Sequence, residues 1–214
     1  MSTVDSFLLM ISSALVRDIY QRNINPDVQE KQIKTLTDEI AALRLLTPLA
    51  KLYTAKQYVA MASETLESFG GAGYVEDTGL PVILRDGQVL SIWEGTTNVL
   101  SLDALRAMEK NQSLEALMGL LESKLATVKE RELLPAVKQV RAAAATIPGA
   151  LTAASTSGPE AIQSTARDIA YALTRTYTAA LMLEHAQWAL AELDDGRAAL
   201  AAKRWCDQTL VSLG

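Results

Sequence analysis

Residues 68–98 read SFGGAGYVEDTGLPVILRDGQVLSIWEGTTN, and they form the least regular stretch of a chain of 214 residues. Glycines divide this stretch into turns, with one short apolar piece at residues 80–84 between them. Glycine readily adopts the positive φ that turns and helix ends often require. The stretch therefore predicts an irregular connection between helices, and connections held by rigid helices are where functional sites tend to lie.

The sequence on both sides of this connection predicts helices, because apolar residues recur there at helical spacing. Pro48 is expected to kink or divide the long helix that precedes Gly70, and Pro148-Gly149 is expected to end a later one, leaving residues 150–158 as a linker. Two predicted helices have an open start: one begins between residues 31 and 38 and ends at 70, and one begins at 96 or 97 and ends at about 108. The other predicted helices span about 4–20, 113–129, 132–146, 158–194 and 197–210. Nothing in the second half of the chain alternates with the period of a strand, so we expect an all-α helical bundle with one irregular segment near the middle.

Composition narrows the possible partners. The formal net charge is −5, and lysine and arginine form no cluster dense enough to follow a phosphate backbone or an anionic membrane. One cysteine and one histidine make a disulfide or a zinc site implausible. No apolar stretch approaches the roughly 20 residues that span a bilayer. We therefore expect a soluble, cytoplasmic protein with no metal, no nucleic-acid partner and no membrane partner.

Several residues that could carry chemistry also have a plainer structural interpretation. His185 lies inside a predicted helix, where a structural or surface role is favoured over a catalytic triad. Cys206, beside a tryptophan, is more simply a small buried residue than a reactive thiol. Glu76 and Asp77 could act as paired carboxylates, but neighbours in a loop diverge easily, so a solvated turn is the better interpretation.

The glycines and tryptophans have two interpretations as well. Residues 70–73, GGAG, could cradle a phosphate, yet no strand precedes them and no Lys-Ser or Lys-Thr follows, so a helix end and turn is the simpler interpretation. Trp93, Trp188 and Trp205 are expected in the core rather than on a ligand platform.

Glu94 is a better candidate for a chemical role than these residues, because of its neighbours. Ile92, Trp93 and Gly95 surround it, so we expect the carboxylate to be partly shielded from water, as a general base often is. Gly95 would leave space for a substrate beside it. The alternative is that a glutamate just before a helix stabilises the positive end of the helix dipole.

Three motifs taken together resemble the C-terminal helical domain of acyl-CoA dehydrogenases. They are SFGGAGY at 68–74, LRD at 84–86 and IWEGTTN at 92–98, in this order and spacing. The tryptophan before Glu94 and the further helical sequence most resemble the alkylation-response branch, which carries an additional C-terminal helical domain. We therefore expect residues 1–110 to form the dehydrogenase-like domain and residues 111–214 the additional one. DNA binding, known in that branch, is not carried over, because residues 108–214 contain 11 Lys and Arg against 12 Asp and Glu.

The resemblance implies α,β-dehydrogenation of an acyl-CoA thioester, with FAD as the hydride acceptor. Glu94 would be the base that removes the α-proton, and Gly95 would pack against the substrate. Thr96 and Asn98 would contact FAD. Gly70 and Gly71 would approach the ADP portion of a flavin held by a neighbouring subunit, which implies a homo-oligomer.

Two departures from the family pattern limit this expectation. Glu67 stands where the family often has glutamine, and a negative charge there would oppose a pyrophosphate. The N-terminal and middle domains of the family are not present in these 214 residues, so we expect the chain to be inactive without them. The alternatives are an alkylation-response-type flavoprotein with little turnover and a non-catalytic helical oligomerisation module.

Overall fold

A computed structural model of the chain describes residues 30–213, and the helix expected over 4–20 lies outside them. The described elements are α2 (Glu30–Ser68), η2 (Gly70–Gly73), η3 (Glu76–Thr78), α3 (Pro81–Leu90), α4 (Thr97–Asn111), α5 (Ser113–Thr127), α6 (Leu134–Thr156), α7 (Pro159–Leu193) and α8 (Arg197–Cys206). No strand occurs within residues 30–213, and the all-α prediction is confirmed.

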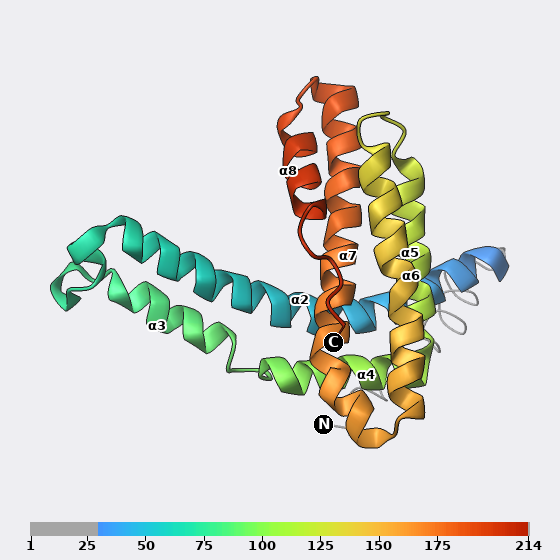
Figure 1. The fold of residues 1–214 in the computed structure, drawn as a ribbon, viewed down its shortest axis with the longest axis horizontal. Coiled ribbons are helices and arrows are strands. Elements are labelled where there is room, and N and C mark those ends of the chain that lie inside the picture. Colours follow the sequence, from blue (N-terminus) through green and yellow to red (C-terminus); the bar gives the residue numbers. More distant parts are fainter. Residues whose placement is uncertain (1–29, 214) are drawn as a thin grey trace, which may run out of the picture.

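The molecule consists of a bundle and an arm. Helices α5, α6, α7 and α8 stand side by side as the bundle, and α2 crosses it below its middle, with α4 nearer the lower end (Figure 1). The second half of α2 leaves the bundle and is followed by η2, η3 and α3, which returns along it (Figure 1). We call this projection, residues 53–90, the arm. Among the described helices, including the 39-residue α2 and the 35-residue α7, none combines the length and apolar composition needed to cross a bilayer.

The first half of α2 is anchored in the core through one face. Ala42, Leu45, Leu49 and Leu52 follow at steps of three and four residues and are at most 1% exposed. They belong to a buried cluster with residues of α4, α5, α6 and α7: Leu100, Ala104, Ala107, Leu117, Ile147, Ile169, Ala170, Ala172 and Leu173. This cluster joins the dehydrogenase-like sequence segment to the bundle.

An ion pair supports the same contact. The Arg44 guanidinium of α2 donates two hydrogen bonds to the Asp103 carboxylate of α4, at 2.9 and 3.0 Å. Both side chains are largely buried, which limits screening by solvent and favours this paired, two-bond geometry. The pair therefore fixes α4 in register against α2.

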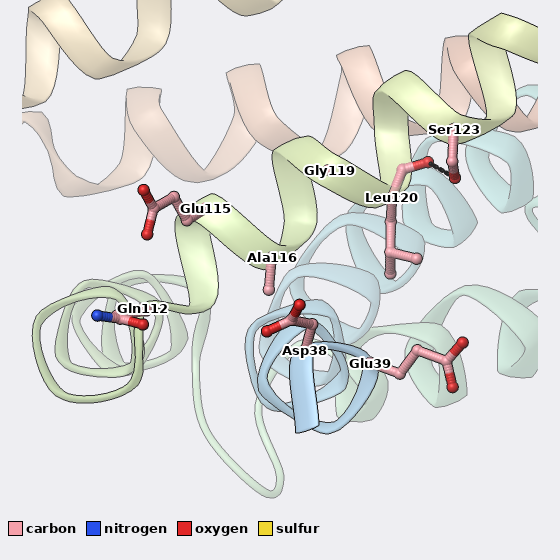
Figure 2. Close-up of a pocket in the computed structure, with 8 residues that line it drawn as sticks. All are labelled: Asp38, Glu39, Gln112, Glu115, Ala116, Gly119, Leu120 and Ser123. Atoms are coloured by element: carbon pink, nitrogen blue, oxygen red, sulfur yellow. Dashed lines mark hydrogen bonds between the residues drawn. The ribbon is translucent and has the colours of Figure 1, made fainter. Parts of the chain in front are cut away.

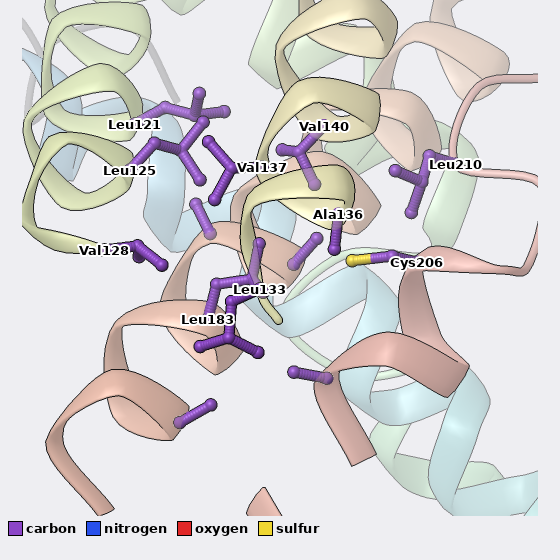
Figure 3. Packing of buried hydrophobic residues seen from close by; sticks show 14 of the residues in the cluster. Leu121, Leu125, Val128, Leu133, Ala136, Val137, Val140, Leu183, Cys206 and Leu210 are labelled. Carbon is purple, nitrogen blue, oxygen red and sulfur yellow. The ribbon is translucent and has the colours of Figure 1, made fainter. Parts of the chain in front are cut away.

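A second buried cluster holds the upper part of the bundle together (Figure 3). Leu133, Val140 and Leu183 are completely buried, and Leu125 and Cys206 are only 1% exposed. Four different helices and the turn before α6 supply these residues. The bundle therefore has a core of its own, continuous with the α2 cluster through α5, α6 and α7.

The expected irregular connection over residues 68–98 was wrong in its middle part, because a helix, α3 (Pro81–Leu90), forms there. Pro81 occupies the first turn, where its missing N–H has no intrahelical partner. Gly87 does not break the helix. A Cβ there would lie 2.5 Å from a ring carbon of Tyr58, so Gly87 allows α3 to pack closely against α2.

The predicted helix end at Pro148-Gly149 was wrong, because α6 continues through both residues to Thr156. Residues 150–156 are therefore helix rather than linker. α2 also continues through Pro48, so this proline does not divide the helix. Burial explains the continuation of α6, because Ile147 is fully buried and Ala154 is 8% exposed, so packing on both sides of Pro148 offsets its lost hydrogen bond.

Leu49→Ala should lower the free energy of unfolding by about 2–5 kcal/mol, because it opens a cavity at a fully buried site. Urea unfolding followed by circular dichroism measures the change. Leu43→Ala is the matched control on the same helix, since Leu43 is 61% exposed and the same truncation there should change the value by less than about 0.5 kcal/mol. Equal losses for the two variants would contradict the assigned core.

Candidate active site

The turn between α3 and α4 carries Glu94 in an unusual backbone conformation. Glu94 has φ +55°, and Gly95 follows with φ +113°. A residue with a side chain loses about 1–2 kcal/mol in the left-handed region, whereas glycine does not. Such strain persists only where the surrounding structure holds it, and it is frequent at functional sites. Gln112 and Asp194 have a similar φ, but they cap the ends of α4 and α7. Glu94 lies in a turn beside Gly95, Thr96 and Asn98, which makes this turn the candidate site.

The side chains of this turn are open to solvent. Glu94 is exposed, and Ile92 and Trp93 are 61% and 57% exposed. The expectation that its neighbours shield the carboxylate is wrong for this chain, because both apolar side chains point away from the core. The expected core position of Trp93 is wrong for the same reason.

Two side chains from elsewhere hold the main chain of the turn. The Lys51 ammonium of α2 donates hydrogen bonds to the carbonyl oxygens of Trp93, at 2.7 Å, and Gly95, at 2.5 Å. On the other side, a Cβ at Gly95 would lie 3.1 Å from the Leu100 side chain, so the turn packs closely on α4. Sequence reasoning missed Lys51, because no motif or spacing relates it to a turn more than 40 residues later.

The start of α4 lies directly after Glu94. Thr96 is the N-cap residue, but its hydroxyl makes no capping hydrogen bond, and both Thr96 and Asn98 are exposed. Thr97 is buried, and its carbonyl oxygen accepts a hydrogen bond from the Ser101 hydroxyl. The first N–H groups of a helix lack intrahelical partners. This end of α4 therefore offers polar groups to a ligand beside Glu94.

Gly70 and Gly71 lie at the far tip of the arm, within the short 3-10 helix η2 (Figure 1). Gly70 has φ +57°, as expected for a glycine that ends a helix. Roughly 25 Å of α2, at 1.5 Å per residue, separates Lys51 beneath the Glu94 turn from Ser68 at the tip. The structure thus brings Glu94, Gly95, Thr96 and Asn98 together, and it places Gly70 and Gly71 elsewhere.

The contacts of the remaining candidate residues indicate structural rather than chemical roles. Arg85 donates two hydrogen bonds to Glu76, which lowers the pKa of that exposed carboxyl, so Glu76 belongs to an ion pair rather than an acid–base pair with Asp77. His185 is exposed and stacks on Trp188, with ring centroids 5.5 Å apart. Burial raises the pKa of the Cys206 thiol to about 11, so it stays protonated at neutral pH, which favours a packing role.

The tryptophan prediction holds in part. Trp205 is half-buried and packs edge-on against Tyr53, with ring centroids 6.3 Å apart. Trp188 is 50% exposed on α7, so its expected core position is wrong. Ala186 and Ala189 are buried on either side of it, so the buried face of α7 continues through these alanines and leaves Trp188 outside.

A groove of about 520 Å³ lies away from this turn, between the start of α2 and α5 (Figure 2). Its acidic lining consists of Asp38, Glu39 and Glu115. The carboxylates of Glu39 and Glu115 lie at opposite ends of the groove in Figure 2, too divergent to act on one group. Across the described part of the chain, no three histidine, cysteine or acidic side chains gather as metal ligands would.

The sequence matches two related family descriptions in consecutive pieces. Residues 28–109 match the family described as "Acyl-CoA dehydrogenase, C-terminal domain". Residues 112–214 match the family described as "Acyl-CoA dehydrogenase 11 C-terminal domain-like". With the helical fold and the motif around Glu94, these matches identify the class of protein: the chain belongs to the acyl-CoA dehydrogenase family.

Particular relatives refine this assignment. The chain is 38% identical over 218 residues to "Acyl-CoA dehydrogenase family member 11" of Caenorhabditis elegans, covering 99% of this chain and 33% of that protein. Over 76 residues it is 40% identical to "Putative acyl-CoA dehydrogenase AidB" of Escherichia coli, covering 36% of this chain and 14% of that protein. The chain thus spans a third or less of the length of these relatives.

Solved structures agree with the sequence matches. The crystal structure of C. elegans ACDH-11 in complex with C11-CoA superposes with a TM-score of 0.75 at 37% identity, covering 98% of this chain and 34% of that one. The apo form of Bd2924 superposes with a TM-score of 0.51, also at 37% identity, over 88% of this chain and 33% of that one. The chain is a C-terminal acyl-CoA dehydrogenase region homologous to that of ACDH-11.

Gly95→Ala should lower the free energy of unfolding by about 1–3 kcal/mol, because the added Cβ meets Leu100 and φ is +113°. Gly119→Ala is the control, since Gly119 lies within helix α5 with open space around it and should stabilise the protein by about 0.5–1 kcal/mol. Thermal unfolding of both variants measures whether each substitution lowers or raises the stability of the protein. A neutral or stabilising Gly95→Ala would show that the turn is not held as described.

Proposed function

We propose that this chain supplies the base of an FAD-dependent acyl-CoA dehydrogenase, which introduces an α,β double bond into an acyl-CoA thioester. The observation that carries the proposal is Glu94 at φ +55°, presented to solvent at the corner between α3 and α4. The acyl-CoA substrate class is supported by the family membership and by the C11-CoA complex of ACDH-11.

Glu94 would take the α-proton of the thioester on its carboxylate. An exposed carboxylate can reach a substrate, and proton abstraction requires hydrogen-bond reach before any tuning of acidity. Gly95 carries no side chain, so the substrate can pass close to the main chain beside the base. Packing of the substrate and of neighbouring protein over Ile92 and Trp93 would remove the water that now surrounds the carboxylate.

Thr96 and Asn98 suit a flavin because both are exposed polar residues at the unsatisfied end of α4. When bound, FAD would accept the β-hydride. The hydroxyl of Thr96, free of a capping role, and the amide of Asn98 would orient the flavin beside the base. These two residues would then set which face of the substrate meets the cofactor.

Gly70 and Gly71 would contact the nucleotide end of a flavin bound mainly by a second subunit. The length of the arm supports this assignment, because these glycines lie far from Glu94 of the same chain (Figure 1). A Cβ at either glycine would meet no atom within 4 Å, so their main chain is open to a ligand. Glu67, exposed on the last turn of α2, would need to point away from the pyrophosphate.

We propose that residues 1–110 and 111–214 act as two domains of one C-terminal region. We also propose that these 214 residues are inactive by themselves, since they span about a third of the length of ACDH-11. An alkylation-response-type flavoprotein is the rival to an efficient dehydrogenase, and the chemistry at Glu94 discriminates between them.

Glu94→Gln should reduce turnover by at least about 100-fold, because the amide cannot accept the α-proton. The assay joins this chain to the preceding two thirds of C. elegans ACDH-11 and follows acyl-CoA-dependent bleaching of bound FAD. Glu109→Gln is the control, as Glu109 is an exposed carboxylate on α4. Retained turnover in Glu94→Gln would exclude Glu94 as the base, and turnover by the 214 residues alone would exclude the proposed inactivity.

The chain should self-associate through the arm, where Met61, Phe69 and Tyr74 are 68%, 54% and 86% exposed. Light scattering should give a mass above 23.1 kDa that rises with concentration. Tyr74→Glu should shift the mass toward the monomer, because it places a charge in the apolar contact. Leu134→Glu, at a 46% exposed site on the bundle, should not. A monomer at all concentrations would contradict the proposal.

A further inference from the structure

The contact between Lys51 and the Glu94 turn joins two parts of the chain that no motif connects. Lys51 lies on α2 between Leu49 and Leu52, which are 0% and 1% exposed, so its main chain is fixed by the core. Its ammonium donates to two carbonyl oxygens of the turn, one on each side of Glu94. The lysine therefore links a rigid part of the fold to the main chain that carries the carboxylate.

The geometry of this contact matches the conformation at Glu94. The carbonyls of Trp93 and Gly95 both reach one ammonium group, and the residue between them has φ +55°. Two carbonyl dipoles that converge repel each other unless a cation lies between their oxygens. A left-handed glutamate is also unfavourable by itself. The attraction between the Lys51 ammonium and the two carbonyl oxygens offsets the repulsion between the carbonyls and the cost of the left-handed conformation.

We propose that Lys51 is a positioning residue, which holds Glu94 in the left-handed conformation and so directs its carboxylate out of the α3–α4 corner. That the carboxylate acts as a base rests on the proposed function. The conformational part of the inference rests only on the two hydrogen bonds and the positive φ. Lys51 acts through the main chain and makes no contact with substrate in this role.

The test is NMR spectroscopy of the full chain labelled with 13C and 15N. In the wild type, Glu94 should give the strong intraresidue amide–Hα cross-peak of a positive φ. Lys51→Met should abolish this cross-peak and shift the amide signals of Glu94 and Gly95. Lys51→Arg, which keeps a cation with several donors, should restore the cross-peak at least in part. Lys56→Met, at an exposed lysine on the same helix, is the matched control.

An unchanged Glu94 cross-peak in folded Lys51→Met would overturn the inference. If that variant does not fold, the wild type decides the question through scalar couplings from the Lys51 ammonium nitrogen to the carbonyl carbons of Trp93 and Gly95. The presence of these couplings supports the proposed role of Lys51, and their absence overturns it. A loss of the base assignment through Glu94→Gln leaves these signals unchanged, so the two proposals fail separately.

Discussion

The buried face of α2 from Ala42 to Leu52 is the contact on which the rest of the structure depends. Its leucines pack against α4 and the bundle in one continuous cluster, and the Arg44–Asp103 ion pair fixes the register of that contact. Because the same helix then extends out of the bundle, it also serves as the support for α3. A single long helix thus transmits the rigidity of the core to the turn at Glu94 and to the tip of the arm.

The candidate site combines a strained main chain with an open side chain. Lys51 and Leu100 hold the turn from two sides, while Glu94, Thr96 and Asn98 face solvent. Rigid presentation of an accessible carboxylate suits a reaction in which the other face of the pocket comes from a different part of the assembly. Under the proposed function, the protein elements that exclude water from Glu94 would be distinct from those that position it.

Local patterns explain which helices could be predicted from the sequence and which could not. Gly158-Pro159 and the turn after Leu193 mark the ends of α7 because their backbone preferences are local. Pro148 misled the prediction of a helix end, and Pro48 does not divide α2, since buried neighbours hold each helix together through its proline. Gly87 misled it for a related reason: the glycine that would weaken an isolated helix is the residue that lets Tyr58 approach α3.

The sequence by itself determined the helical class, the family resemblance and the group of Glu94, Gly95, Thr96 and Asn98, because these residues are close along the chain and a turn keeps them close in space. Only the tertiary structure decided that Glu94 is exposed, that Gly70 and Gly71 lie at the opposite end of the arm, and that Lys51 binds the turn. Burial and long-range hydrogen bonds depend on how α2 packs. That packing follows from the whole core and cannot be read from any one segment.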